Sequence, residues 1–397
     1  MSGYALRCRV CEELAPSAPF DACVRCDGPT DAAYDWEAVA RTLTRDTIAA
    51  GPESLWRYGA LLPGGAPAGA DAGWTPLVRA ERLSALLGLD LHLKLEVANP
   101  TRSYKDRVAA VAVSAALDHG VTTRCCSSTG NLGDAVGAAA AAAGLETIVL
   151  APESVRTARV AARHAGARVL GVRGTYDDCR RLALELASLF PWGFVSGNLH
   201  PYASEGAKTI SFEIAEQLDW QLPHAVVCPA ASGTLFAKLA QGFAEVIRAG
   251  LADEPAPRMF AGQAQGSSPI AAAFADDRTI SRVEASTAVA SLAVGDPSFG
   301  DLALGAARAT DGGVVAIPER EIEQYTELLA ETTGVAPDFS GGAALGALVE
   351  ATLARDIEPG SRVVLVVTGA RPEPADADVT VIDAAPDDVL RALGLSS

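Results

Sequence analysis

The middle of the chain alternates between short apolar segments and helix-like segments, and this alternation limits the possible folds more than any other feature. From Val121 to Gly250, each short apolar run precedes a longer segment with apolar residues at helical spacing. Near-continuous apolar strands are typical of parallel sheets covered by helices on both faces. The sequence therefore predicts an α/β fold of parallel twisted sheets flanked by helices. Strands are expected at 121–126, 147–151, 168–172, near 194 and at 224–228, with helices at 132–143, up to about 166, and at 177–190, 204–218 and 234–250.

The flanking regions are less regular. We expect, in chain order, a short helix at 34–49, a loop at 64–73, strands at 75–77 and 91–95 around a helix at 80–87, a strand at 314–317, helices at 319–333 and 342–354, and a strand at 362–367. Residues 251–310 lack a clear period and receive no strand. A chain of 397 residues is long enough for two or three domains.

Composition narrows the class of protein. The formal net charge is −17 and no basic stretch is present, so we do not expect a nucleic-acid partner. No uncharged apolar run reaches membrane-spanning length, and residues 1–8 lack the apolar core of a signal peptide. We therefore expect a cytoplasmic protein without a membrane partner.

The eight cysteines form two groups. Two Cys-x2-Cys pairs near the N-terminus have the spacing of a four-thiolate structural zinc ribbon; these are Cys8, Cys11, Cys23 and Cys26. The alternatives are two local disulfides, which a reducing cytosol disfavours, or a remnant that holds no metal. The others lie in apolar or helical contexts and are interpreted as small buried hydrophobic residues; these are Cys125, Cys126, Cys179 and Cys228.

One lysine, Lys105, stands where a helix is expected to start. Asn99 and Pro100 end a strand-like run, and Ser103 with Asp106 forms a capping-box pattern for a helix to about His119. The free N–H groups of a first helical turn disfavour the ammonium form of an amine. Such a lysine can act as a nucleophile or form a Schiff base, although this stretch alone is more typical of a solvated surface turn.

Two predicted strand-to-helix turns carry polar groups, and in open parallel sheets ligands bind at such turns. Residues 127–133, Ser-Ser-Thr-Gly-Asn-Leu-Gly, offer hydroxyls and N–H groups for a carboxylate. Residues 229–234, Pro-Ala-Ala-Ser-Gly-Thr, are small enough to wrap a phosphate monoester but lack the nucleotide triphosphate pattern Gly-x4-Gly-Lys-Ser/Thr. Either turn alone could also be an ordinary structural turn.

Taken together, these stretches resemble the pyridoxal-phosphate enzymes of fold type II, and within them the threonine synthase family. Residues 99–107, Asn-Pro-Thr-Arg-Ser-Tyr-Lys-Asp-Arg, resemble the family's cofactor-lysine motif Asn-Pro-Thr-Gly-Ser-Phe-Lys-Asp-Arg. Residues 128–131 are similar to its asparagine loop, 205–209 to its Glu-Gly-Gln-Lys-Thr segment, and 295–297 to a loop of the large domain. Some family members also carry an N-terminal cysteine ribbon.

The resemblance implies a role for each matching residue. Lys105 would form the Schiff base with pyridoxal 5'-phosphate, Asn131 would bond the phenolic oxygen of the cofactor, and Thr368 would meet its pyridine nitrogen. Ser128 and Thr129 would hold the substrate carboxylate. The cofactor phosphate would be bound by the turn composed of Ala230, Ala231, Ser232, Gly233 and Thr234.

Several positions depart from the family pattern. The arginine that usually precedes Glu-Gly-Gln-Lys-Thr is Ala203, and the glutamine is Ala207. Conversely, the glycine of the lysine motif is Arg102, a cation close to Lys105, which we interpret either as a substrate-binding residue or as a surface charge. The segment 335–340 also departs from the family's Glu-Pro-Ala pattern. These changes leave cofactor binding as expected but put the substrate in doubt.

We therefore predict a threonine synthase-like lyase that converts O-phosphohomoserine to threonine and phosphate. The alternatives are β-replacement or β-elimination on a serine derivative such as O-phosphoserine, and a non-catalytic homologue. The expected domains are a zinc ribbon at 1–30, a large cofactor-binding domain at 31–107 and 201–397, and a small α/β domain at 108–200. The expected partners are a small amino-acid substrate and a second copy in a homodimer.

Overall fold

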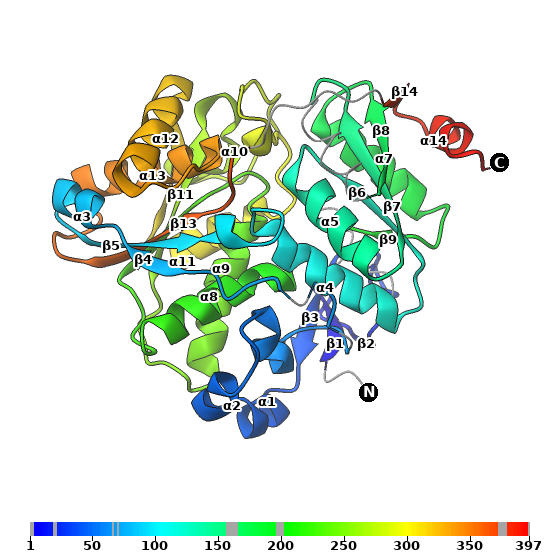
Figure 1. The fold of residues 1–397 in the computed structure, drawn as a ribbon. Helices are drawn as coiled ribbons and strands as arrows, with labels where there is room; N and C mark the ends of the chain where they lie inside the picture. The colour runs from blue at the N-terminus through cyan, green and yellow to red at the C-terminus, as the bar shows by residue number, and fades with distance from the viewer. Residues whose placement is uncertain are drawn as a thin grey trace. The chain divides into compact units, whose positions relative to one another are not determined.

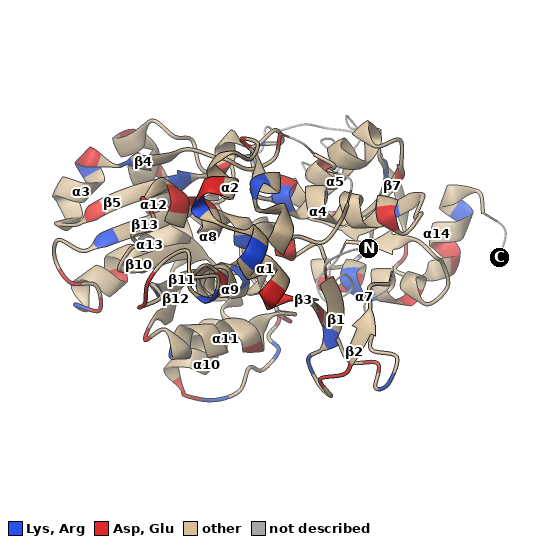
Figure 2. Ribbon diagram, turned by 90° about the horizontal axis from the view of Figure 1, so that it is seen from below, with Lys and Arg blue, Asp and Glu red and all other residues tan. Residues whose placement is uncertain are grey.

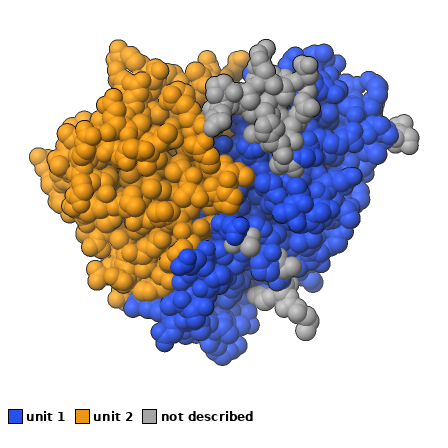
Figure 3. All heavy atoms as spheres, viewed as in Figure 1, with its two compact units in different colours: residues 1–72, 105–206, 372–397 blue, residues 73–104, 207–371 orange. Residues whose placement is uncertain are grey.

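The protein contains two compact units, each with a parallel-rich sheet. The computed structural model describes residues 4–18, 22–65, 67–69, 71–155, 166–195, 202–371 and 379–395. Unit 1 comprises Met1–Ala72, Lys105–Gly206 and Pro372–Ser397, and unit 2 comprises Gly73–Tyr104 and Ala207–Arg371. Figure 3 shows the units in different colours.

Unit 1 begins with a small antiparallel sheet. Strand β1 (Tyr4–Cys8) lies between β2 (Leu14–Pro16) and β3 (Thr30–Tyr34). The ring of Tyr4 meets the ring of Tyr202 edge-on at 5.6 Å, and the Tyr34 hydroxyl donates a 2.7 Å hydrogen bond to Glu205. These contacts fasten the small sheet to the start of α8. Three short helices follow it: α1 (Trp36–Thr42), α2 (Arg45–Ala49) and the 3-10 helix η1 (Leu55–Leu61).

The main sheet of unit 1 is parallel throughout. Its strand order is β14-β8-β7-β6-β9, as Figure 1 shows. The strands are β6 (Thr123–Ser127), β7 (Glu146–Pro152), β8 (Arg168–Val172), β9 (Gly193–Phe194) and β14 (Thr380–Ile382). The helices of this unit are α4 (Lys105–Asp118), α5 (Asn131–Ala142), α7 (Tyr176–Ala187) and α14 (Pro386–Leu393). Because parallel strands end at one edge, the turns after β6 and β8 share an edge of the sheet.

Unit 2 is built on a six-stranded sheet of order β12-β11-β10-β13-β5-β4, in which only β4 is antiparallel. Its strands are β4 (Leu77–Arg79), β5 (Asp90–Leu95), β10 (Ala225–Pro229), β11 (Arg258–Ala264), β12 (Gly313–Ile317) and β13 (Arg362–Val367). Its helices are α3 (Glu81–Leu87), α9 (Thr234–Arg248), α10 (Pro269–Ala275), α11 (Gly300–Ala309), α12 (Glu319–Thr333) and α13 (Phe339–Leu353), together with most of α8 (Glu205–Gln217).

The core of unit 2 lies between the sheet and α13. Leu345 and Leu348 of this helix pack with Val227 of β10 and Leu365 of β13, and all four side chains are buried. A fully buried ion pair, Lys94–Glu213 at 2.7 Å, accompanies this core. Its carboxylate also accepts hydrogen bonds from two backbone N–H groups, which compensates its removal from water. Packing against α13 and this ion pair therefore support the strands of the unit 2 sheet.

The structure confirms the α/β class but corrects several predicted elements. The segment given no strand, 251–310, contains β11, which is hydrogen-bonded on both sides in the sheet of unit 2. The single helix expected at 34–49 is the two helices α1 and α2. The strand expected at 75–77 begins at Leu77 as β4. Most of the helix expected to end near 166 falls outside the described residues.

The compact units also differ from the expected domains. The C-terminal strand β14 pairs with β8, so this segment belongs to unit 1 and not to the large domain that was expected to reach residue 397. Residues 31–72 likewise cluster with unit 1. The first difference arises from a pairing between residues far apart in the chain.

The distribution of charged residues and the hydropathy of the helices can be compared with the composition of the chain. Acidic and basic residues are both scattered over the helices, strands and loops in Figure 2. Within the described ranges, no helix combines the length and the apolar character that a membrane span requires.

Candidate active site

The segment before Lys105 is fastened to the end of β13 within unit 2. The Tyr104 N–H donates to the Thr368 carbonyl at 2.9 Å, and the Ala370 N–H donates to the Arg102 carbonyl at 3.0 Å. The buried Asn99 side chain donates to Glu96 at 2.8 Å and accepts from the Gly73 N–H at 2.9 Å. These hydrogen bonds hold the segment that ends immediately before Lys105 beside Thr368.

Arg102 has a backbone conformation that favours glycine. Its φ is +63°, in the left-handed region, and its side chain is exposed. A side chain in this region costs about 1 kcal/mol relative to glycine. The arginine thus occupies a strained turn three residues before Lys105.

Lys105 is the first residue of α4, as the sequence predicts, and its side chain is half-buried. The remainder of α4 is almost completely buried down to Ala116. Gly206 allows α8 to approach α4, since a Cβ at this position would overlap the Arg107 carbonyl. The glycine of the Glu-Gly-Ala-Lys-Thr segment therefore has a packing role, which holds the start of α4 in place.

The turn after β6 is closed by its own side chain. The Ser128 hydroxyl accepts hydrogen bonds from the Gly130 N–H at 3.0 Å and the Gly133 N–H at 2.8 Å, and it lies 3.1 Å from the Gly130 carbonyl. The Ser128 hydroxyl is thus already engaged with the backbone of the turn. Thr129 and Asn131 are half-buried, and Asn131 is the first residue of α5.

The turn after β10 is open by comparison. Gly233 has φ +82°, and a Cβ there would lie 2.7 Å from the Phe299 carbonyl. The hydroxyls of Ser232 and Thr234 lie 3.0 Å apart. Among the described residues no side chain caps α9, and its first turn contains no acidic residue. The N–H groups of this turn can therefore receive an anion.

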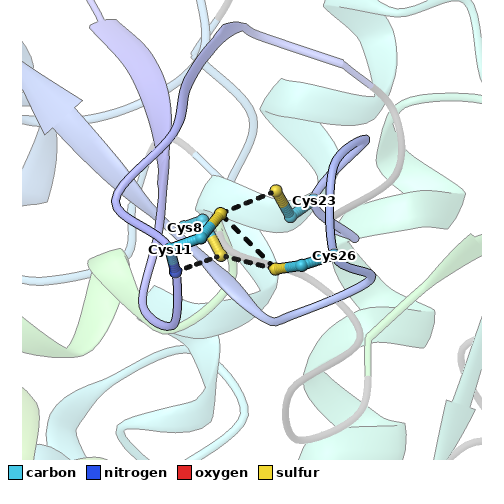
Figure 4. Close-up of side chains that lie close together, drawn as sticks. All are labelled: Cys8, Cys11, Cys23 and Cys26. Atoms are coloured by element: carbon cyan, nitrogen blue, oxygen red, sulfur yellow. Dashed lines mark hydrogen bonds between the residues drawn. The ribbon is translucent and has the colours of Figure 1, made fainter.

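The four N-terminal cysteines converge from two loops, as Figure 4 shows. Their sulfur atoms all lie within 4.8 Å of one another, with separations of 3.5 Å for Cys8–Cys26 and 3.6 Å for Cys11–Cys23. Tetrahedral zinc with Zn–S bonds of about 2.3 Å separates its thiolates by about 3.8 Å. Backbone N–H groups, that of Cys11 first, lower the pKa of Cys8 to about 6. The donor set and spacing fit a four-thiolate metal site.

Sequence comparison connects these features. The profile of the family described as pyridoxal-phosphate dependent enzyme matches residues 70–369. The chain belongs to this family. The match includes the lysine segment, both turns and the end of β13.

Relatives of this enzyme cover nearly the whole chain. The threonine synthase of Methanosarcina acetivorans is 32% identical over 373 residues, which is 92% of this chain and 91% of the relative. The threonine synthase of Mycobacterium tuberculosis is 32% identical over 377 residues, covering 93% and 99%. The chain is thus a threonine synthase-like, pyridoxal-phosphate-dependent lyase.

Solved structures agree on the fold. Threonine deaminase isoform 2 from Solanum lycopersicum superposes with a TM-score of 0.66 at 20% identity, covering 91% of this enzyme and 89% of that chain. The L-serine ammonia-lyase from Rhizomucor miehei gives 0.62 at 25% identity, covering 75% and 94%. The fold is therefore that of fold-type II pyridoxal-phosphate enzymes.

The residues of this enzyme fit its cofactor. Bound pyridoxal phosphate supplies an electron sink that stabilises negative charge on the substrate carbon. Three features could hold such a group. The lysine at the start of α4 would supply an amine, the turn before α9 an anion site, and the buried Thr368 a neutral hydroxyl.

Two polar residues near the site were not singled out in the sequence. Tyr176, the first residue of α7, is hydrogen-bonded to the Ser127 side chain. Burial raises the pKa of Asp338, the cap residue of α13, to about 7, and its N–H donates to the Gly369 carbonyl. Tyr176 could have been noticed because it follows the predicted strand 168–172, and strand-to-helix turns of one sheet share an edge.

Proposed function

We propose that this enzyme converts O-phosphohomoserine and water to threonine and inorganic phosphate. The bond between the γ-carbon and the phosphate oxygen breaks, and water supplies the hydroxyl on the β-carbon. The observation that carries the proposal is the similarity to threonine synthases, which extends over about the whole length of both chains.

Lys105, Asn131 and Thr368 have separate roles in this proposal. Lys105 would hold the cofactor and would move protons at Cα and the neighbouring carbons of the substrate. Asn131 would bond the phenolic oxygen of the cofactor. The neutral Thr368 hydroxyl would meet the pyridine nitrogen and leave it largely unprotonated, whereas an aspartate would favour a protonated ring.

The two turns bind anions of different origin. Residues 230–234 bind the cofactor phosphate through backbone N–H groups and the hydroxyls of Ser232 and Thr234. Ser128 and Thr129 bind the substrate carboxylate. Since the Ser128 hydroxyl is engaged within its own turn, we assign Ser128 the task of fixing the backbone donors and Thr129 that of a side-chain donor.

The alternative substrate is a serine derivative such as O-phosphoserine, in a β-replacement or β-elimination. It is favoured by the departures from the family pattern, an alanine at 203 and the strained, exposed Arg102. In either case Arg102 is proposed to read the anionic leaving group.

Product analysis separates the two substrates. Purified enzyme is incubated with O-phosphohomoserine or with O-phosphoserine, using Lys105→Ala as the control. Threonine and phosphate in equal amounts from the first substrate alone support the proposal. Product from O-phosphoserine without threonine from O-phosphohomoserine would contradict it.

The N-terminal cysteines are proposed to hold one structural Zn²⁺. The site is closed, because four thiolates leave no position for water or substrate. Metal analysis should find about one zinc per chain, and Cys8→Ser with Cys11→Ser should abolish it. A metal-free preparation with an intact fold would contradict this assignment.

We further propose that the enzyme is cytoplasmic and forms a homodimer. Light scattering of the purified protein would test the dimer.

A further inference from the structure

A cavity of about 700 Å³ lies within unit 1, where the small N-terminal sheet and the end of α4 both contribute to its lining. Tyr4 of β1 and Tyr34 of β3 line it from the sheet, and Asp118 and His119 line it from the end of α4. The glycine-rich segment 59–65 also lines it. The two strands and the helix can be followed in Figure 1. We call this space the N-terminal cavity.

The N-terminal cavity is remote from Lys105. Lys105 is the first residue of α4 and Asp118 is the last. At about 1.5 Å per residue, the two ends of this helix lie about 20 Å apart. None of the candidate cofactor or substrate residues is among the described residues that line the cavity. A ligand in this space would therefore occupy a site of its own.

The charge of the lining favours a cation. Its described residues include one carboxylate, that of Asp118, and no lysine or arginine. One oxygen of this carboxylate accepts a hydrogen bond from the Gly65 N–H at 2.6 Å, and no other described residue donates to it. The end of α4 also carries the negative end of the helix dipole, and its last turn contains no basic residue. A carboxylate or phosphate ligand would be repelled here.

His119 and Tyr4 add polar atoms to the cavity without adding charge. Burial lowers the pKa of His119, although Asp118 opposes this, and burial followed by the Asp118 charge raises the pKa of Tyr4. The His119 ring stacks on the Tyr202 ring at 5.9 Å. Its Nε2 atom is buried and has no hydrogen-bond partner among the described residues. Such an atom is uncommon in folded proteins, and a polar ligand can satisfy it.

The two tyrosines favour an organic cation over a metal ion. The rings of Tyr4 and Tyr34 are buried, and their centroids lie 6.5 Å apart at an angle of 46°. Aromatic rings attract organic cations through their electron-rich faces. Divalent metal ions instead prefer several closely placed oxygen ligands, and the described lining offers a single carboxylate.

We propose that the N-terminal cavity is a second ligand site of this enzyme, which binds a small organic cation with N–H donors. The Asp118 carboxylate pairs with the positive charge, the rings of Tyr4 and Tyr34 contact the cation, and Nε2 of His119 is satisfied by the ligand. The site does not depend on the proposed reaction, because none of these residues takes part in it.

Calorimetric titration of the purified holoenzyme tests the proposal, with methylguanidinium as the probe. Methylurea is the matched control, because it has nearly the same shape and no charge. A guanidinium ion does not attack an aldehyde as a primary amine does, so the bound cofactor is left unchanged. We expect methylguanidinium to bind with a dissociation constant of roughly 1 mM, which suits so small a ligand, and methylurea to bind at least about ten-fold more weakly.

Substitutions at Asp118 separate charge from shape. Asp118→Asn keeps an oxygen for the Gly65 N–H and should weaken methylguanidinium binding at least about five-fold. Asp118→Glu keeps the charge and should retain more of the affinity than Asp118→Asn. Asp46→Asn removes an exposed carboxylate of α2 that does not line the cavity, and it should match the native enzyme.

Lys105→Ala shows whether the probe binds at the cofactor site instead. Native affinity for methylguanidinium in this variant supports a separate site, whatever substrate the enzyme uses, and loss of binding would overturn the inference. Equal binding of methylurea, native affinity in Asp118→Asn, or no binding at about ten times the expected dissociation constant would also overturn it. Failure to form threonine would refute the proposed substrate and leave these titrations unaffected.

Discussion

The turn after β6 and the turn after β10 have similar sequences and different structures. Both join a buried parallel strand to a helix and both contain hydroxyls and glycines. In the first turn, the Ser128 hydroxyl accepts hydrogen bonds from the backbone N–H groups of Gly130 and Gly133. In the second, the hydroxyls of Ser232 and Thr234 face each other and no described side chain caps α9.

This difference indicates which turn needs a ligand. A side-chain cap contributes about 1 kcal/mol to a helix start and satisfies N–H groups that would otherwise lack partners. Both helices have a glycine at the cap position and no cap from that residue, but Ser128 accepts the N–H of Gly133 in the first turn of α5. At α9 we propose that an anion takes this part. We therefore place the cofactor phosphate at the second turn and expect the first to be stable without ligand.

Replacing the glycine of the second turn by alanine should have the largest effect on cofactor affinity. Gly233→Ala places a methyl group 2.7 Å from the Phe299 carbonyl at φ +82°. We expect cofactor affinity to fall at least about 100-fold, since a displacement of the turn misaligns all its N–H donors at once. Equilibrium titration of the cofactor-free enzyme measures this.

Gly130→Ala is the matched control in the first turn. Its φ of +157° is also unusual for other residues, but a Cβ there would meet nothing within 4 Å. We expect lower stability and at most a few-fold change in cofactor affinity. Equal losses of affinity in the two variants would remove the distinction between the turns.

The start of α13 extends the comparison, because its cap residue, Asp338, can gain or lose a proton. Burial raises the pKa of Asp338 from 3.8 to about 7, although the N–H groups of Gly341 and Ser340 oppose this. Between these values the folded protein binds the proton more tightly than the unfolded chain does, so the free energy of unfolding should decrease as pH rises from 4 to 7. The contribution is at most about 1.4 kcal/mol per pH unit.

Asp338→Asn should remove this part of the pH dependence. Chemical unfolding at pH 5 and pH 7 gives the two free energies for each protein. A variant whose stability falls as steeply as that of the native enzyme would show that another group is responsible.

The serines of the two turns should respond in opposite ways. Ser128→Ala removes a cap and should lower the free energy of unfolding of the cofactor-free enzyme by about 1 kcal/mol. Ser232→Ala should change that stability by less than about 0.5 kcal/mol but weaken cofactor binding five- to ten-fold. Thermal unfolding and cofactor titration of both variants are compared, and the reverse pattern would invert our assignment.

Arg102→Gly should affect substrate preference more than stability or cofactor affinity. It relieves a left-handed conformation at φ +63° and should stabilise the folded protein by at most about 1 kcal/mol, since glycine also has more freedom in the unfolded chain. Cofactor affinity should stay constant while the preference between O-phosphohomoserine and O-phosphoserine changes. Unchanged preference would identify Arg102 as a surface charge.

The sequence predicted the elements whose apolar pattern is strong. Strands 168–172 and 362–367 and the helix 319–333 have the predicted bounds. Strand β11 was missed because Arg258, Gly262 and Gln263 interrupt its apolar run, although the sheet buries it. The pairing of β14 with β8 joins residues more than two hundred positions apart, and no local signal encodes it.

The site was predictable only as a set of residue types at strand ends. Lys105 was correctly placed at a helix start, since capping and proline signals are local. The orientation of the Ser128 hydroxyl depends on the conformation of its own turn. The hydrogen bond between Tyr176 and Ser127 depends on a contact between two elements. The sequence places Tyr176 after a predicted strand, but it does not indicate which residue the side chain contacts, because Ser127 lies on a separate element.

The central claim, that the turn after β10 binds the cofactor phosphate, is tested most directly by the affinity ratio of pyridoxal phosphate to pyridoxal. Both compounds carry the aldehyde, and only the first carries the phosphate. We predict that Ser232→Ala lowers this ratio five- to ten-fold by weakening the phosphate compound alone, while Ser128→Ala leaves it unchanged. An unchanged ratio in Ser232→Ala together with a reduced ratio in Ser128→Ala would contradict the account.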